Sequence, residues 1–166
     1  MQTSFPKMLL AVIGLSVAVI SLNAQSWQAV KVVARGAGKT IIQGGTGQTG
    51  GFIPVLTTIA FHAERQGQAV SGDFECLALA PAAPTSGQFT VNAMYVTGQI
   101  TSAEVEGDTA TLKGTATVTG LGAGHNLPFT LVVRKGGPGS TSVLTVSGLT
   151  FDEILLEGKF EVAGDE

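Results

Sequence analysis

A period-two alternation of residue types is the feature that most limits how this chain can fold. In residues 109–119, Ala, Leu, Gly, Ala and Val occupy the even-numbered positions, and Thr or Lys occupies the odd-numbered ones. Successive side chains of a β-strand point to opposite faces, so the pattern predicts a strand with one buried face and one face in water. Threonine is β-branched and polar, which suits the outer face of a sheet.

Seven further segments are also expected to form strands between turns that contain glycine or proline. These segments are residues 27–33, 55–64, 71–79, 94–104, 129–135, 142–146 and 155–162. Gly67 and Gly107 mark short turns and predict two hairpins, because glycine enters tight turns without steric cost. The expected fold class is all-β, a single antiparallel β-sandwich or small barrel of seven to eight strands.

The first 24 residues have the composition of a secretory signal peptide. Lys7 supplies the positive charge, residues 8–20 are apolar or small, and Ala24 ends a small-residue cleavage site. The apolar run is shorter than the roughly 20 residues that a membrane-spanning helix needs. The sequence therefore predicts cleavage after Ala24, a secreted or periplasmic location, and no membrane span in the mature chain.

A glycine-rich stretch separates the signal peptide from most of the expected strands. Residues 36–51 offer little to bury and are expected to form a linker or mobile loop. The expected organisation is a signal peptide (1–24), an N-terminal strand with a Gly-rich linker (25–51) and an antiparallel β domain (52–166). Residues 80–86 contain two prolines and are expected to form an exposed connection.

Charge and cysteine content restrict the partners of the chain. Lys and Arg number 9 against 12 Asp and Glu, a net charge of −3, so the basic excess typical of nucleic-acid binding is missing. Cys76 is the single cysteine and has no intramolecular partner. Its setting, between Phe74 and Leu77, indicates a small buried residue in a strand, with pairing between chains as the alternative.

Two glycine-rich motifs resemble nucleotide-binding loops but lack the required context. Residues 36–40 (GAGKT) end like a phosphate-binding loop, yet position 33 is Val where that pattern requires Gly. Residues 45–50 match G-x-G-x-x-G, but Pro54 and a β-branched run follow where a helix is needed. No cofactor is therefore expected.

Catalytic and metal-binding patterns are also missing from the sequence. His62 and His125 are the two histidines, and neither forms a metal-ligand spacing with Asp73 or Cys76. No G-x-S-x-G nucleophile motif is present. Acidic pairs such as Asp152-Glu153 are interpreted as solvation of wet strand faces. We therefore name no catalytic, cofactor-binding or metal-binding residue, and the sequence favours a non-enzymatic protein.

Several segments resemble a group of secreted bacterial β-domains, the post-COAP-type domains. The resemblance lies in residues 113–120 (KGTATVTG), Gly122 and Gly124, residues 128–133 (PFTLVV) and residues 136–139 (GGPG). It covers residues 52–162 and implies an exported β-domain, with no catalytic residues to transfer. The last strand, residues 158–162 (GKFEV), departs from the G-x-I-x-I-H-K ending of that group.

These observations favour a non-enzymatic extracytoplasmic module that binds a partner or serves a structural role. Rigid sheets commonly present function on loops, which points to residues 121–128 and 136–140. The candidate binding residues there are His125, Asn126, Pro138 and Ser140.

Three other hypotheses compete with this one. The first is a small barrel enzyme or carrier with an internal apolar pocket. The second is a self-associating surface or envelope protein, because Gly- and Thr-rich strands specify their register weakly. The third, an outer-membrane barrel, conflicts with the outward Thr and Lys side chains of residues 109–119.

Overall fold

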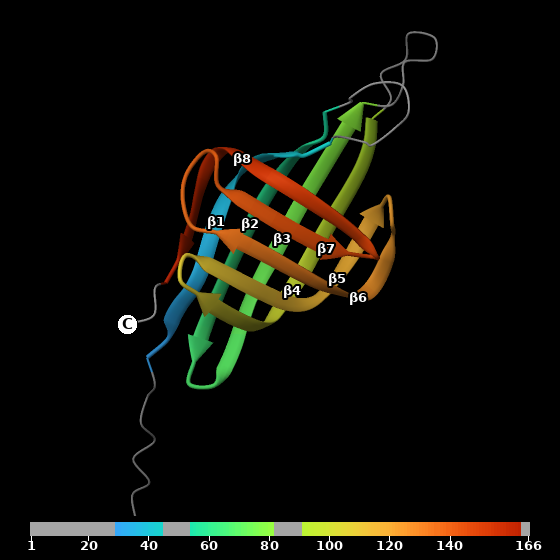
Figure 1. The fold of residues 1–166 in the computed structure, drawn as a ribbon. Helices are drawn as coiled ribbons and strands as arrows, with labels where there is room; N and C mark the ends of the chain where they lie inside the picture. The colour runs from blue at the N-terminus through green and yellow to red at the C-terminus, as the bar shows by residue number, and fades with distance from the viewer. Residues whose placement is uncertain (1–28, 45–53, 82–90, 164–166) are drawn as a thin grey trace, which may run out of the picture.

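The structure is a computed structural model that describes residues 29–44, 54–81 and 91–163 and contains eight β-strands. The strands are β1 Lys31–Ile42, β2 Leu56–Gln66, β3 Ala69–Pro81, β4 Val91–Glu106, β5 Thr109–Gly120, β6 Gly124–Arg134, β7 Thr141–Val146 and β8 Leu149–Val162. Each strand pairs antiparallel with the next, and β8 pairs with β1, so the sheet closes into a barrel (Figure 1). The all-β prediction is confirmed, and the architecture is the barrel.

The alternation that predicted β5 also describes its environment. Ala110, Leu112 and Val118 are buried inside the barrel, whereas Lys113 and Thr115 are exposed on the outer wall. Gly67 and Gly107 lie in the turns that join β2 to β3 and β4 to β5, as expected, and have φ angles of 61° and 57°.

Residues 36–42 of the glycine-rich segment belong to β1. The prediction of a linker was therefore wrong for these residues. Gly36 faces the interior, where an added Cβ atom would lie 2.7 Å from the rings of both Phe61 and Phe160. The glycine therefore makes room for two aromatic rings carried by other strands. Residues 45–51 of the expected linker, residues 82–86 and the predicted signal peptide lie outside the described residues.

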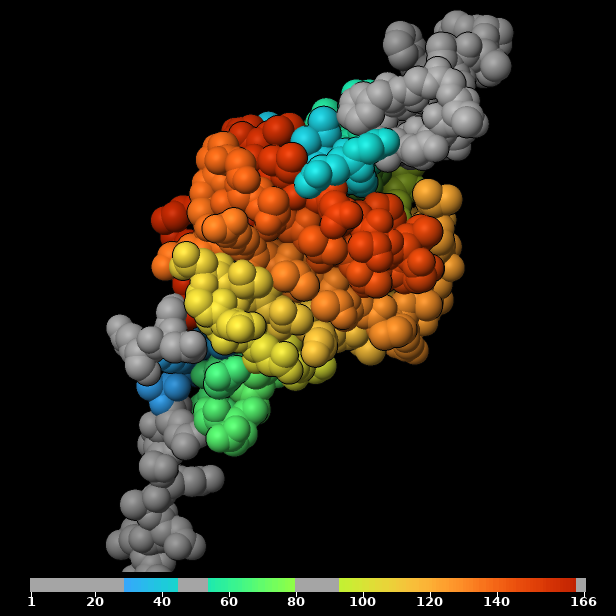
Figure 2. Space-filling view, viewed as in Figure 1, coloured from blue at the N-terminus to red at the C-terminus, as the bar shows by residue number. Residues whose placement is uncertain are grey.

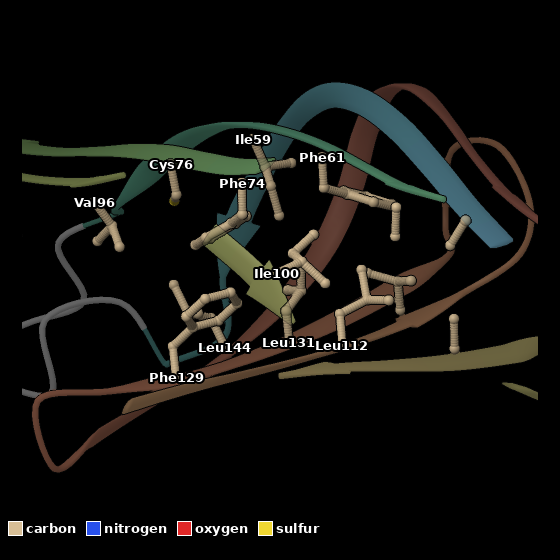
Figure 3. Packing of buried hydrophobic residues seen from close by; sticks show 14 of the residues in the cluster. Ile59, Phe61, Phe74, Cys76, Val96, Ile100, Leu112, Phe129, Leu131 and Leu144 are labelled. Atoms are coloured by element: carbon tan, nitrogen blue, oxygen red, sulfur yellow. The ribbon is translucent and has the colours of Figure 1, made fainter. Parts of the chain in front are cut away.

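Apolar side chains fill the barrel interior (Figure 3). The rings of Phe74 and Phe129 stack with centroids 5.2 Å apart, and those of Phe61 and Phe160 lie 5.4 Å apart. Cys76 is free and only 3% exposed, which confirms its interpretation as a buried strand residue. Beside it lies an interior cavity of about 10 Å³, about the space of one water molecule.

Two ion pairs, Arg35–Glu161 and Lys39–Glu157, cross the outer side of the β1–β8 seam, and Lys159 joins Glu161 from within β8. Arg35 Nε and Lys159 Nζ lie 2.6 and 2.9 Å from the Glu161 carboxylate, and Lys39 Nζ lies 2.8 Å from Glu157. Hydrogen bonds from Lys159 and Arg35 lower the pKa of Glu161 to about 2. Because a lowered carboxyl pKa favours the folded state at higher pH, these pairs stabilise the seam above about pH 4.5 and lose this effect as the pH falls.

The connection between β6 and β7 continues the wall of the barrel along β8. The Gly139 amide donates to the Leu155 carbonyl and the Leu155 amide donates to the Ser140 carbonyl, both at 2.8 Å. Gly136 forms a bridge with Phe160 in the same way. Figure 2 shows this face, where β7 and β8 (orange to red) lie between the upper end of β1 (cyan) and the β4–β5 hairpin (yellow).

Candidate functional site

A β-bulge at the start of β6 places His125 and Asn126 on the outer wall. Ala116 of β5 pairs with Leu127, and Val118 pairs with Gly124, so the one residue between them on β5 faces two on β6. Such bulges redirect side chains and are frequent beside binding sites. Asn126 has a φ of 54°, a left-handed conformation that asparagine adopts more readily than most residues.

An open hollow of about 210 Å³ lies beside this bulge, and we call it the outer hollow. It is lined by Thr97, Gly98 and Gln99 of β4, Thr115, Ala116 and Thr117 of β5, and Asn126 of β6. The lining side chains carry no charge, and its three hydroxyls and two carboxamides both donate and accept hydrogen bonds. The arrangement suits a neutral polar ligand better than an ionic one.

His125 adjoins the outer hollow, and Tyr95 lies farther along the outward face of β4. His125 Nδ1 lies 3.5 Å from the hydroxyl of Thr117, within the hollow. Tyr95 precedes Thr97 by two residues on the outward face of β4 and is 39% exposed. Its hydroxyl donates a 3.1 Å hydrogen bond to Glu75 on β3, on the side of β4 away from the hollow, and this bond raises the pKa of Tyr95.

The structure separates the four candidate residues of the sequence into two places. His125 and Asn126 lie at the outer hollow, although within β6 rather than in the exposed turn that we expected. Pro138 and Ser140 lie in the β6–β7 connection, whose backbone extends the wall along β8. The threonine hydroxyls of β5 were predicted to face water. The sequence does not indicate which of these hydroxyls lie beside the bulge on β6.

A buried carboxyl group inside the barrel is the second unusual feature. Glu153 of β8 is 1% exposed, so the interpretation of Asp152-Glu153 as surface solvation was wrong for Glu153. The hydroxyls of Thr40 on β1 and Thr57 on β2 donate to its carboxyl oxygen Oε2, the latter at 2.9 Å. Burial raises the pKa of Glu153, although these two hydrogen bonds act in the opposite direction.

A row of outward apolar residues crosses the end of the barrel where β2 begins. Leu56 pairs with Leu79, and Leu79 pairs with Ala93, whose carbonyl accepts a hydrogen bond from the Leu121 amide. The leucines are 53%, 42% and 64% exposed in chain order. We call these four residues the apolar row.

The outer surface of the described strands also carries His62. Its Nε2 lies 3.3 Å from the Glu64 carboxylate. Within residues 29–44, 54–81 and 91–163, no three His, Cys, Asp or Glu side chains gather as metal ligands would. The same residues contain no helix long and apolar enough to span a membrane.

Comparison of the chain with family models, curated proteins and solved structures found no match. The resemblance to post-COAP-type domains therefore stays a prediction.

Proposed function

We propose that this protein is a secreted or periplasmic, non-enzymatic binding module whose outer hollow takes a neutral, hydroxyl-rich ligand, a segment of glycan. The observation that carries the proposal is the outer hollow itself, in which five uncharged polar side chains converge beside a bulge. Residues such as Asn126, held in a sparsely populated backbone conformation, concentrate at ligand sites.

The chemistry of the lining supports a glycan. A sugar presents adjacent hydroxyls that both donate and accept, and the carboxamides of Gln99 and Asn126 can do the same. These side chains are carried by hydrogen-bonded strands, so less conformational entropy is lost when a ligand binds.

The interior of the barrel gives less support to a carrier. The cavity beside Cys76 has a volume of about 10 Å³, about the space of one water molecule, so it has no room for a carried ligand. A second depression on the outer wall, of about 430 Å³, lies at the β1–β8 seam and is lined in part by Arg35, Lys159 and Glu161. Their charges are already engaged with one another.

Gln99→Ala and Asn126→Gly are each expected to weaken glycan binding about tenfold, which corresponds to the loss of one hydrogen bond worth roughly 1.4 kcal/mol. Glycine is chosen at 126 because it retains the left-handed backbone conformation while removing the carboxamide. Binding is measured by NMR titration of the protein with soluble neutral oligosaccharides of glucose, mannose and N-acetylglucosamine, with a polyuronate as the charged counterpart.

Thr111→Ala serves as the matched control for these variants. Thr111 lies on the outward face of β5 but does not line the hollow. The Thr111→Ala variant should therefore bind the oligosaccharides as tightly as the unmodified protein does. If no neutral oligosaccharide shifts the resonances of the outer hollow, or if only the polyuronate does, the glycan assignment is wrong.

Self-association is the second candidate function, and the apolar row favours it. Leu56 and Leu79 are register partners, and Leu121 follows across Ala93, so the row has three exposed leucines and no charged residue. Exposed apolar patches mark interaction sites. Two copies could bury the row against its own equivalent around a two-fold axis. Pairing through strand edges is less available, because β1 and β8 close the sheet on each other.

Leu79→Lys is expected to convert such a dimer to a monomer, because a lysine at the centre of the row would be buried without a partner charge. Size-exclusion chromatography with light scattering measures the mass at several protein concentrations. Thr145→Lys, on the exposed face of β7, is the control and should leave the mass unchanged. A monomer at every concentration for the unmodified protein would eliminate this candidate.

A further inference from the structure

Glu153 has an environment unlike that of any other acidic residue in the described strands. The buried polar or charged residues there are Thr40, Thr57, Ser142 and Glu153, and Glu153 alone among them carries an ionisable side chain. Barrel interiors of this size are normally filled by packed side chains. A carboxyl at such a position therefore calls for an explanation beyond packing, and the proposed glycan site does not use it.

The groups that face Glu153 are neutral. Hydroxyls reach it from Thr40 on β1 and Thr57 on β2, and Cys76 is the titratable group in the apolar lining of the adjacent cavity. The nearby cation Lys39 points outward and pairs with Glu157. A carboxylate here would be buried without a counter-charge in the described barrel, which strongly favours the protonated form.

Ser142 is a further neutral group buried beside Glu153. It is the register partner of Glu153 on β7, it is 1% exposed, and its hydroxyl has no hydrogen-bond partner in the described part of the chain. Inward side chains of register partners lie close enough to interact across two strands. The Ser142 hydroxyl can donate to either form of the carboxyl, and it supplies no counter-charge for an ionised Glu153.

We propose that Glu153 is a proton-dependent latch, which ties β8 to β1 and β2 when its carboxyl is neutral and loosens the adjoining end of the barrel when the carboxyl ionises. The end concerned contains the cavity shared by Glu153 and Cys76, as well as Ile42 at the end of β1 and Phe151 near the start of β8. The latch is independent of the glycan site on the outer wall.

The direction of the pH effect follows from the buried position. The pKa of Glu153 is raised above its ordinary value of 4.5 in the closed barrel, chiefly by burial. An acid with a raised pKa stabilises the closed state fully below about pH 4.5 and loses that contribution as the pH rises toward the closed-state pKa. The outer-wall carboxyls of Glu157 and Glu161 have lowered pKa values, so they titrate at a lower pH than Glu153 does.

Cys76 supplies a direct probe of the latch, because it lines the same cavity, is 3% exposed and is the single cysteine of the chain. The rate at which the thiol of the folded protein reacts with iodoacetamide is divided by the rate for the urea-unfolded protein at the same pH. This ratio removes the ordinary ionisation of the thiol and leaves the protection that the closed barrel provides.

For the unmodified protein we expect protection to fall as the pH rises from about 5, by up to tenfold per pH unit, and then to level off above the closed-state pKa. Glu153→Gln preserves the shape and the hydrogen-bonding capacity of the side chain without its ionisation. The protection of Cys76 in this variant should not change between pH 5 and 9. Glu106→Gln, an exposed substitution at the end of β4, is the control, and its protection should fall with pH as in the unmodified protein.

Glu153→Met, which fills similar space without any titration, replaces Glu153→Gln if that variant does not fold, and the same pH-independent protection is expected. A fall in protection that is equally steep in the Glu153 variant and in Glu106→Gln would overturn the proposal. Protection of the unmodified protein that does not change between pH 5 and 9 would overturn it as well, whatever the variants do.

Discussion

Replacing Phe129 with alanine is expected to lower the free energy of unfolding by about 3–5 kcal/mol. Phe129 of β6 is 3% exposed, and its ring stacks on that of Phe74 from the opposite side of the barrel interior (Figure 3). Removal of the ring forfeits both its burial and its contacts with Phe74. Because β-strands on all sides are hydrogen-bonded into the closed barrel, the wall can collapse only partly into the resulting space. Urea denaturation followed by circular dichroism measures the loss.

A second substitution tests whether the stacked rings themselves set the space available at this level of the barrel. An added Cβ atom at Gly98 would lie 2.8 Å from the Phe129 ring and 3.3 Å from the Phe74 ring, with side-chain atoms as its three nearest contacts. Gly98→Ala should therefore destabilise the unmodified protein by about 1–3 kcal/mol. In the Phe129→Ala background it should cost much less, since the obstructing ring is gone.

Gly72→Ala is the control for this double-mutant cycle. Its added Cβ atom would lie 2.0 Å from the His62 carbonyl oxygen, and its three nearest contacts are all backbone atoms of β2, none of them in Phe129. The Gly98–Phe129 pair should thus show a coupling of about 0.5–3 kcal/mol, and the Gly72–Phe129 pair should show a smaller one. Equal couplings for the two glycines would show that the rings do not define the space at position 98.

The strands of this fold are largely predictable from the chain, because alternation is a local property. The pattern around Leu112 identified β5 and its buried face, and glycines at 67 and 107 located two hairpins. Closure is different, since it depends on β1 pairing with β8, for example Arg35 with Glu161 across most of the chain. Nothing in either segment alone distinguishes a barrel from a sandwich. The role of Gly36 was missed for the same reason, because the rings that require it belong to β2 and β8.

The candidate site was predictable in part. His125 and Asn126 were identified from an exposed, glycine-rich context, and the structure places them beside the outer hollow. Gln99 was not identified, because its neighbourhood is created by pairing with β5 and by a bulge on β6. Glu153 did leave a signal, since it alternates in phase with Phe151 and Leu155, whose side chains face the interior. An acidic residue in phase with apolar ones is the local pattern that indicates a buried carboxyl.

Gly158→Ala is expected to destabilise the barrel by about 3 kcal/mol or more, through backbone strain and a steric clash together. Gly158 lies on β8 at the closing seam and has a φ of 115°. An added Cβ atom would approach the Ala37 carbonyl oxygen to 2.1 Å and the Gly38 Cα to 2.6 Å. Both are backbone atoms of β1, so the two strands that close the barrel would have to separate.

Gly139→Ala distinguishes the contribution of the clash from that of the strain. Gly139 also has a positive φ, 92°, but an added Cβ atom would meet nothing within 4 Å. Gly139→Ala should therefore lower the free energy of unfolding only by the backbone strain, about 1–2 kcal/mol. The additional loss for Gly158→Ala measures the energy needed to separate β1 from β8. If the two variants lose equal stability in urea, the seam yields without cost and the closure of β1 on β8 contributes little to the stability of the fold. A larger loss of stability for Gly158→Ala than for Gly139→Ala would instead show that the closure of β1 on β8 contributes to the stability of the fold.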